Sequence, residues 1–202
     1  LFTSCTWLHQ ADAPGHDLRA PEAWDVENGD SSIVVAIIDS GMLPYHPDLG
    51  GTGTGASHLW TNVAEANGLP GVDDDGNGYV DDVHGWDFVS KAYSISVAGE
   101  DVLDADNDPN DFAGHGTAVS GLVGAIVDNG IGIAGVAPEV RLMPLRMAWA
   151  VGVQPNAAVS MTYAAQAIRY ATRMGATIIN ASWESIDSTG SGLGAAVTAA
   201  TR

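Results

Sequence analysis

The sequence predicts an α/β fold built on a mostly parallel sheet with helices on both faces. Residues 33–38 (IVVAII) form a continuous apolar, largely β-branched run without alternation, which is typical of a strand covered on both faces. Further along the chain, segments with strand and helix patterns alternate. With 202 residues, 46% of them hydrophobic, and no internal repeat, the chain suits one domain with a sizeable core.

The first half of the chain contains few regular elements. Residues 20–26 suit a short helix, which a turn at residues 28–30 separates from the strand at residues 33–38. Residues 50–113 are rich in Gly, Asp and Asn and have little helical period. They predict a long irregular insertion.

The second half alternates between strands and helices. Residues 116–127 are small and apolar and predict a buried helix, and residues 140–146 predict a strand. An amphipathic helix is expected at residues 157–174, followed by a strand at residues 177–181. In such folds, ligand sites lie at the carboxyl ends of the strands.

Composition argues against several classes of function. Twenty-five acidic residues against seven basic ones give a formal charge of −18, which disfavours binding to nucleic acids or anionic membranes. The single cysteine, Cys5, cannot form an internal disulfide, and no Cys/His cluster has zinc-site spacing. No stretch approaches the roughly twenty apolar residues of a membrane helix. The chain starts at Leu1 without a signal-peptide pattern, so we expect a mature or trimmed product.

Two polar residues stand where chemistry is expected. Asp39 follows the strand at residues 33–38 and faces the usual ligand crevice, although an isolated D-S-G would favour a simple capping role. His115 lies in GHGTAVSG, where the next helix should begin. The helix dipole disfavours a protonated imidazole there, so His115 suits a neutral general base. Spacing alone does not show that the two residues meet.

Four segments resemble characteristic blocks of the subtilisin-like serine proteases, in the order of that family. IVVAIIDSGMLPYHPDL, DFAGHGTAVSGLVGA, GIAGVAPEVRLMPLRM and ATIINASWES resemble its Asp block, its His block, the following strand and the substrate-binding strand. The resemblance implies a subtilisin-like fold and an Asp-His-Ser triad, with Asp39 and His115 as two members. In that triad His115 would shuttle the proton between serine and leaving amine, and Asp39 would fix its tautomer.

The resemblance implies a nucleophile that this chain does not contain. The family's serine lies in a G-T-S-x-A/S-x-P segment, and its oxyanion-hole asparagine in a G-N block; neither has a match before Arg202. Neither Asn180 nor Ser182 suits these roles. We therefore interpret residues 1–202 as a partial peptidase domain, truncated before its C-terminal part, which we expect as a partner. A partial sequence, a nicked enzyme and a deliberately shortened protein stay open as explanations.

The resemblance also implies substrate contacts at Ser182, Trp183 and Glu184. They align with the strand edge whose backbone pairs with an extended peptide. Glu184 departs from the usual glycine. Its side chain would narrow the cleft, favour basic residues in the substrate, or point to solvent.

The acidic segment at residues 73–82 (DDDGNGYVDD) predicts a calcium site. Its five carboxylates would repel one another without a cation, and a D-x-D-x-N-G pattern offers the hard oxygen ligands that calcium prefers. The expected ligands are Asp73, Asp75, Asn77, the Tyr79 carbonyl and Asp82, with Asp81 as the alternative to Asp82. His84 stands where an EF-hand has its glutamate, and the stretch instead resembles an insertion common in bacterial subtilisin-like proteases. A solvated acidic loop is the other interpretation, and it is the one we favour for residues 100–111.

The predicted function is that of a secreted serine endopeptidase that acts on proteins or peptides and is stabilised by structural calcium. Acyl transfer to serine and then to water would be the reaction. Two alternatives stay open. One is a catalytically inactive, calcium-binding pseudoprotease or fragment, and the other is a metal-dependent hydrolase that uses His115 with nearby aspartates.

Overall fold

The computed structural model describes residue 8 and residues 16–50, 58–91, 96–152, 157–184 and 192–201. Cys5 and Arg202 lie outside the described residues. In chain order the elements are α1 (Ala20–Trp24), β1 (Val34–Asp39), the 3-10 helix η2 (Pro47–Leu49), α2 (Val63–Ala66), β2 (Trp86–Asp87), α3 (His115–Gly124), β3 (Arg141–Arg146), β4 (Ala148–Ala150), β5 (Ala157–Val159), α4 (Met161–Arg173), β6 (Ile178–Asn180) and α5 (Leu193–Ala200).

The main sheet has four strands in the order β2-β3-β1-β6, and all its neighbours pair in parallel. The register of β1 on β3 runs from Val34 opposite Arg141 to Asp39 opposite Arg146. Both strands therefore end at the same edge of the sheet. The predicted α/β class, with a mostly parallel sheet between helices, is confirmed.

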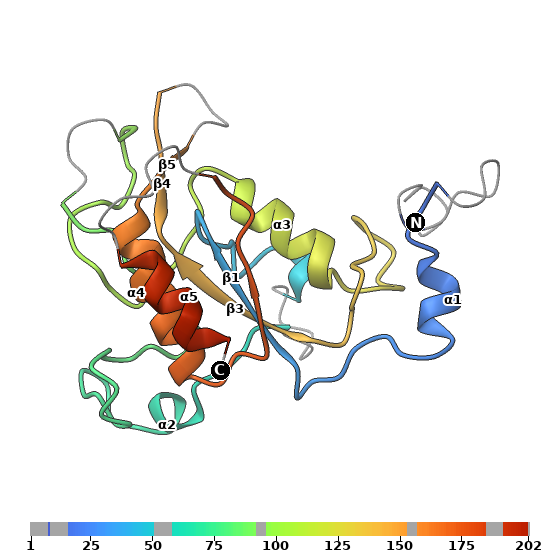
Figure 1. Cartoon of the computed structure of the whole chain (residues 1–202), viewed down its shortest axis with the longest axis horizontal. Coiled ribbons are helices and arrows are strands. Elements are labelled where there is room, and N and C mark those ends of the chain that lie inside the picture. Colours follow the sequence, from blue (N-terminus) through green and yellow to red (C-terminus); the bar gives the residue numbers. More distant parts are fainter. Residues whose placement is uncertain are drawn as a thin grey trace.

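Helices cover both faces of this sheet (Figure 1), with α3 on one side and the paired helices α4 and α5 on the other. Side chains of β1 alternate between the two layers. Val35 and Ile37 belong to the core cluster under α3, whereas Ala36 and Ile38 belong to the cluster under α4 and α5. Because both faces are covered, the strand has no polar side and its sequence is apolar throughout.

The helix expected at residues 157–174 begins later than its apolar spacing predicts. Residues 157–159 instead form β5, which pairs antiparallel with β4. The helix α4 starts at Met161, because the Ser160 hydroxyl caps it by accepting a hydrogen bond from the Tyr163 N–H. The two short strands β4 and β5 form a separate ribbon beside the main sheet.

The insertion at residues 50–113 is irregular in its described parts, apart from α2 and β2. Our interpretation of residues 100–111 as a solvated run is wrong for two of its acids. Glu100 is 9% exposed and Asp111 is 6% exposed. Both are buried because each carboxylate accepts hydrogen bonds from groups distant in the sequence, including Arg146 for Glu100 and Ser40 for Asp111.

Candidate active site

Asp39 and His115 meet at the carboxyl end of the sheet. Asp39 is the last residue of β1, and His115 is the first residue of α3, which packs against β1. The Nδ1 atom of His115 lies 2.7 Å from Oδ1 of Asp39. An ionised carboxylate only accepts hydrogen bonds, so Nδ1 carries the proton and Nε2 is left as the basic nitrogen of a neutral imidazole.

The two side chains differ sharply in their exposure to solvent. The Asp39 side chain is 4% exposed, whereas that of His115 is 49% exposed. Oδ1 of Asp39 also accepts a hydrogen bond from the Ser40 N–H at 2.7 Å. The buried carboxylate is therefore held in place by the Ser40 N–H, and the imidazole bound to it is half exposed, so that a reactant can reach it.

A small depression of about 190 Å³ opens beside this pair. Its lining consists of Asp39, His115, Met147, Ala148, Ala157, Val159, Ser182 and Trp183. Two of the three residues predicted to contact substrate, Ser182 and Trp183, thus share one depression with the Asp-His pair. The third, Glu184, is exposed and does not line it.

The residues after β6 are held in place by polar contacts. The Trp183 indole N–H donates to the Ile38 carbonyl at 2.8 Å, which ties this segment to the end of β1. The Ser182 hydroxyl forms hydrogen bonds with the side chain of Asn180, at 3.0 and 3.4 Å.

A buried ionic network lies next to the site, and sequence analysis did not identify it. The Arg146 guanidinium, which has no exposed surface, pairs with Asp87 and Glu100 and lies 5.9 Å from the ring centre of Phe112. Burial raises the pKa of Asp87 to about 7, although the charge of Arg146 opposes that shift. The signal in the sequence was the arginine at the carboxyl end of the otherwise apolar stretch LMPL, because a cation buried there requires a counter-charge.

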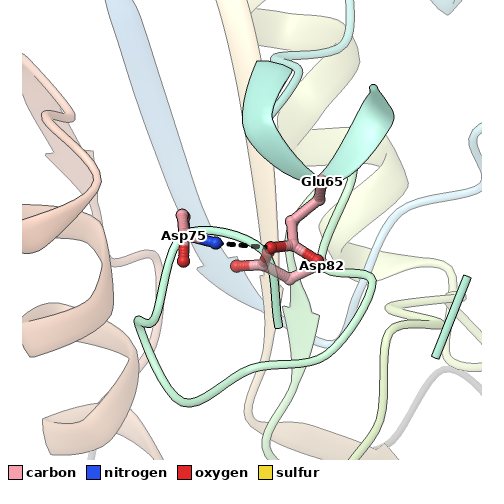
Figure 2. A group of neighbouring side chains, drawn as sticks. All are labelled: Glu65, Asp75 and Asp82. Atoms are coloured by element: carbon pink, nitrogen blue, oxygen red, sulfur yellow. Dashed lines mark hydrogen bonds between the residues drawn. The ribbon is translucent and has the colours of Figure 1, made fainter. Parts of the chain in front are cut away.

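A second acidic group gathers in the insertion. Carboxylate oxygens of Glu65, Asp75 and Asp82 all lie within 4.8 Å of one another. Figure 2 shows Glu65 reaching from α2 toward the two aspartates of the loop, and its Oε1 accepts a hydrogen bond from the Asp75 N–H. Across the described ranges of the chain this is the one group of three or more such side chains that could hold a metal, and it does not include His115.

The expected calcium ligands therefore divide into two sets. Asp75 and Asp82 belong to the group, and the Asn77 amide donates to both of them. The carboxylate of Asp73 instead accepts the N–H groups of Asn77 and Gly78, at 3.0 and 2.9 Å. The Tyr79 ring packs edge-on against three aromatic rings, those of Trp86, Phe88 and Tyr170.

Glu65 was not predicted as a ligand, because it lies outside the acidic segment. It is 5% exposed, and its oxygens accept the N–H groups of Asp74, Asp75 and Asp81. The available signal was one acid inside the otherwise apolar helix VAEA. Burial raises the pKa of Asp82, and hydrogen bonds from Tyr170, Asn77 and Asn62 partly offset that rise.

Comparison with known proteins agrees with this geometry. A model of the subtilase family of peptidases matches residues 30–202. Subtilisin-like protease 1 of Plasmodium vivax is 39% identical over 132 residues, which cover 64% of this chain and 18% of that protein. Thermitase of Thermoactinomyces vulgaris is 30% identical over 165 residues, which cover 82% of this chain and 42% of that protein.

Solved structures of proteases share the fold. A protease from Pseudoalteromonas arctica aligns with a TM-score of 0.63 and 27% identity, covering 98% of this chain and 54% of that one. MycP1 without its N-terminal propeptide aligns with a TM-score of 0.51 and 26% identity, covering 91% of this chain and 43% of that one. The chain thus spans about half or less of the length of each of these proteins.

Proposed function

Because the chain belongs to the subtilase family, we propose that it supplies the histidine and the aspartate of the catalytic triad of a serine endopeptidase whose nucleophile lies in a further part of the domain. The single observation that carries this proposal is the 2.7 Å hydrogen bond between Asp39 and His115 beside an open depression. Serine becomes nucleophilic when a neutral imidazole takes its proton. His115, with Nδ1 donating to a buried carboxylate, has the tautomer that this step needs.

In the proposed reaction His115 accepts the serine proton at Nε2 as the hydroxyl oxygen attacks the scissile carbonyl carbon. Asp39 then stabilises the imidazolium through the same hydrogen bond. His115 returns the proton to the amine as the peptide C–N bond breaks. Water, deprotonated by the same nitrogen, hydrolyses the acyl-enzyme and releases the serine.

The substrate is proposed to be an extended peptide lying beside Ser182 and Trp183. These residues and β5 line the depression from different segments, so a peptide between them would meet backbone on two sides. Glu184 is exposed at the end of the same segment and offers a carboxylate to a basic side chain. We therefore propose a preference for Lys or Arg, which Glu184→Gln should weaken without changing hydrolysis of neutral peptides.

The C-terminal part of the same domain is the proposed partner. Among the described residues β6 pairs only with β1, and Ile178 on it is 52% exposed. Beside β6 an apolar depression of about 430 Å³ lies between α4 and α5, with Ile168, Ile179 and Val197 in its lining. An exposed strand edge next to an apolar surface favours continuation of the sheet. We accordingly propose that residues 1–202, which include the insertion at residues 50–113, form only part of the peptidase domain.

Calcium is the proposed structural ion of the insertion. The side chains of Glu65, Asp75 and Asp82 converge, and all offer hard oxygen donors, so the group fits this cation. The Asn77 amide nitrogen faces Asp75 and Asp82, and its oxygen accepts the Tyr79 N–H, so Asn77 would have to turn its amide to become a ligand. The Tyr79 carbonyl is the other proposed ligand, and Asp73 holds the loop by accepting the N–H groups of Asn77 and Gly78. When bound, the ion would neutralise the converging carboxylates and stabilise the loop. It would take no part in peptide hydrolysis.

We propose that the protein is secreted. In the described ranges, no helix combines the length and hydropathy that crossing a bilayer requires. The formal charge of −18 is compatible with an extracellular protein. Detection of the intact protein in culture medium rather than in washed cells supports this proposal, and retention inside the cells contradicts it.

The proposed function is tested with the intact protein on fluorogenic peptides. Asp39→Asn should lower kcat by about 10⁴-fold because the imidazole loses the group that fixes its tautomer, as in the triad of other serine proteases. His84→Ala is the matched control, since His84 is exposed and its Nδ1 contacts the Trp60 carbonyl in the insertion. Normal folding without hydrolysis of any peptide would instead identify a pseudoprotease.

A further inference from the structure

We infer that Asp111 is a positioning residue that, through Ser40 and Thr117, holds Asp39 and His115 at hydrogen-bonding distance. The inference builds on the proposed peptidase function. Asp111 is 6% exposed and lies four residues before His115, in the loop that leads into α3. No part of the proposed reaction uses it.

Asp111 accepts five hydrogen bonds. Its Oδ1 atom accepts the N–H groups of Ala113 and Gly114, at 3.0 and 2.8 Å, and the Ser40 hydroxyl at 2.8 Å. Its Oδ2 atom accepts the N–H and the hydroxyl of Thr117, at 2.8 and 2.7 Å. A buried carboxylate with this many donors is held in one orientation.

These bonds define where α3 begins. The N-cap residue Gly114 has φ 84° and no side chain to cap the helix. Asp111 supplies part of that function from three residues earlier, because it accepts the N–H of Thr117, the third residue of the helix, together with the N–H groups of Ala113 and Gly114 just before it. Since His115 is the first residue of this helix, the direction of its side chain depends on the turn that Asp111 closes.

Ser40 connects the same carboxylate to Asp39. Its backbone N–H donates to Asp39, and its hydroxyl donates to Asp111, so one residue orients both carboxylates. The hydroxyl oxygen also accepts the Gly116 N–H at 3.0 Å. Ser40 is 1% exposed, which keeps water from replacing these bonds.

Thr117 adds a second connection between the two segments. Its hydroxyl donates to Asp111 and accepts the Leu43 N–H at 3.1 Å. The loop after β1 and the first turn of α3 are thus joined through Ser40 and through Thr117. Without Asp111, Ser40 and Thr117 would keep only their single bonds to the Gly116 and Leu43 N–H groups, and the acceptor that orients both hydroxyls would be lost.

The test measures the His115 Nδ1 proton by NMR in the full chain labelled with ¹⁵N-histidine, well below the melting temperature. In Asp111→Asn and Ser40→Ala its exchange with water should accelerate about tenfold or more, because a charge-assisted contact that orders the pair is lost. Asp104→Asn is the control, since it removes an exposed charge from the same acidic run without a hydrogen bond in this network.

If Asp111→Asn does not fold, two substitutions at Thr117, which perturb the protein less, provide the same test. Thr117→Val preserves the shape of the side chain but removes its hydroxyl, whereas Thr117→Ser retains the hydroxyl. We expect faster exchange in the first and nearly normal exchange in the second. A folded Asp111→Asn or Thr117→Val protein with a lower melting temperature but a protected His115 proton would overturn the inference, because Asp111 would then be purely structural.

Activity of the intact protein separates this inference from the proposed function. If both hold, Asp111→Asn should lower kcat by about 100-fold and leave KM nearly unchanged, since misplacement of a catalytic group affects the chemical step. Accelerated proton exchange in a protein without peptidase activity refutes the proposed function and supports positioning. Full activity of the Asp111→Asn protein refutes positioning while the proposed function stands.

Discussion

Gly116 provides a sharp test of how closely α3 approaches the end of β1. A Cβ atom at this position would lie 2.1 Å from the Gly41 carbonyl oxygen and 3.1 Å from the Cβ of Asp39. The nearer neighbour is backbone and cannot rotate away. On the same helix, a Cβ at Gly121 would meet only the Cδ1 of Ile133, at 3.6 Å, which is an ordinary contact.

The same substitution should therefore have opposite effects at the two glycines. Overpacking costs about 1–3 kcal/mol, and with a rigid neighbour we expect the upper end at Gly116. Against this, alanine in place of glycine stabilises a helix by about 1 kcal/mol, so Gly116→Ala should lose about 2 kcal/mol net. Gly121→Ala meets no opposing contact and should gain about 0.5–1 kcal/mol.

Thermal unfolding followed by circular dichroism measures both changes. For a chain of this size 1 kcal/mol moves Tm by about 2–4 °C, so Gly116→Ala should lower Tm by about 4–8 °C and Gly121→Ala should raise it by about 1–4 °C. Gly116→Ala should also disturb the His115 Nδ1 proton, because it separates the helix from the strand. A Tm for Gly116→Ala equal to that of the parent protein would refute the close approach.

Four further predictions concern buried charge, capping and calcium. The pKa of Asp87 is raised to about 7, so its carboxyl binds more protons in the folded than in the unfolded state between about pH 4 and 7. It therefore makes stability fall as pH rises through that window, and Asp87→Asn should reduce this slope in pH-dependent urea unfolding, leaving the smaller contributions of the other carboxyl groups with raised pKa values. Arg146→Met leaves two buried carboxylates without their cation and should cost about 3–5 kcal/mol in the same assay, and adding Asp87→Asn and Glu100→Gln should recover part of the loss. Ser160→Ala removes the cap that accepts the Tyr163 N–H and should cost about 1 kcal/mol, whereas Ser160→Asp should not. Calcium at about one hundred times its dissociation constant should stabilise the chelator-treated protein by about 2.7 kcal/mol in calorimetry, and an unchanged Tm after EDTA would contradict the calcium site.

Elements with strong local patterns could be predicted from the sequence. The apolar run at residues 33–38 predicts β1, which the structure shifts by one residue to Val34–Asp39, and residues 140–146 predict β3 equally well. The predicted start of α4 was wrong because residues 157–159 have helical spacing, yet they pair with β4, which lies outside that window, at residues 148–150. Local periodicity carries no information about such pairing.

In the candidate site, too, the sequence identified individual residues but not the contacts between them. Asp39 and His115 were identified individually from their place at a strand end and a helix start, but their contact depends on how α3 packs against β1. Glu65 joins Asp75 and Asp82 only through the path of the loop, which no spacing rule describes. Sequence patterns therefore found the chemically suitable side chains, and tertiary packing decided which of them meet.

The most direct measurement is covalent labelling of the intact protein with a fluorophosphonate, followed by mass spectrometry of the modified peptide. We expect one adduct on a serine outside residues 1–202 in the parent protein and none in a folded His115→Ala variant, because the reagent needs a serine activated by this imidazole. No adduct in the parent protein, or an equal rate of labelling in the variant, would contradict the assignment of Asp39 and His115 to a serine peptidase.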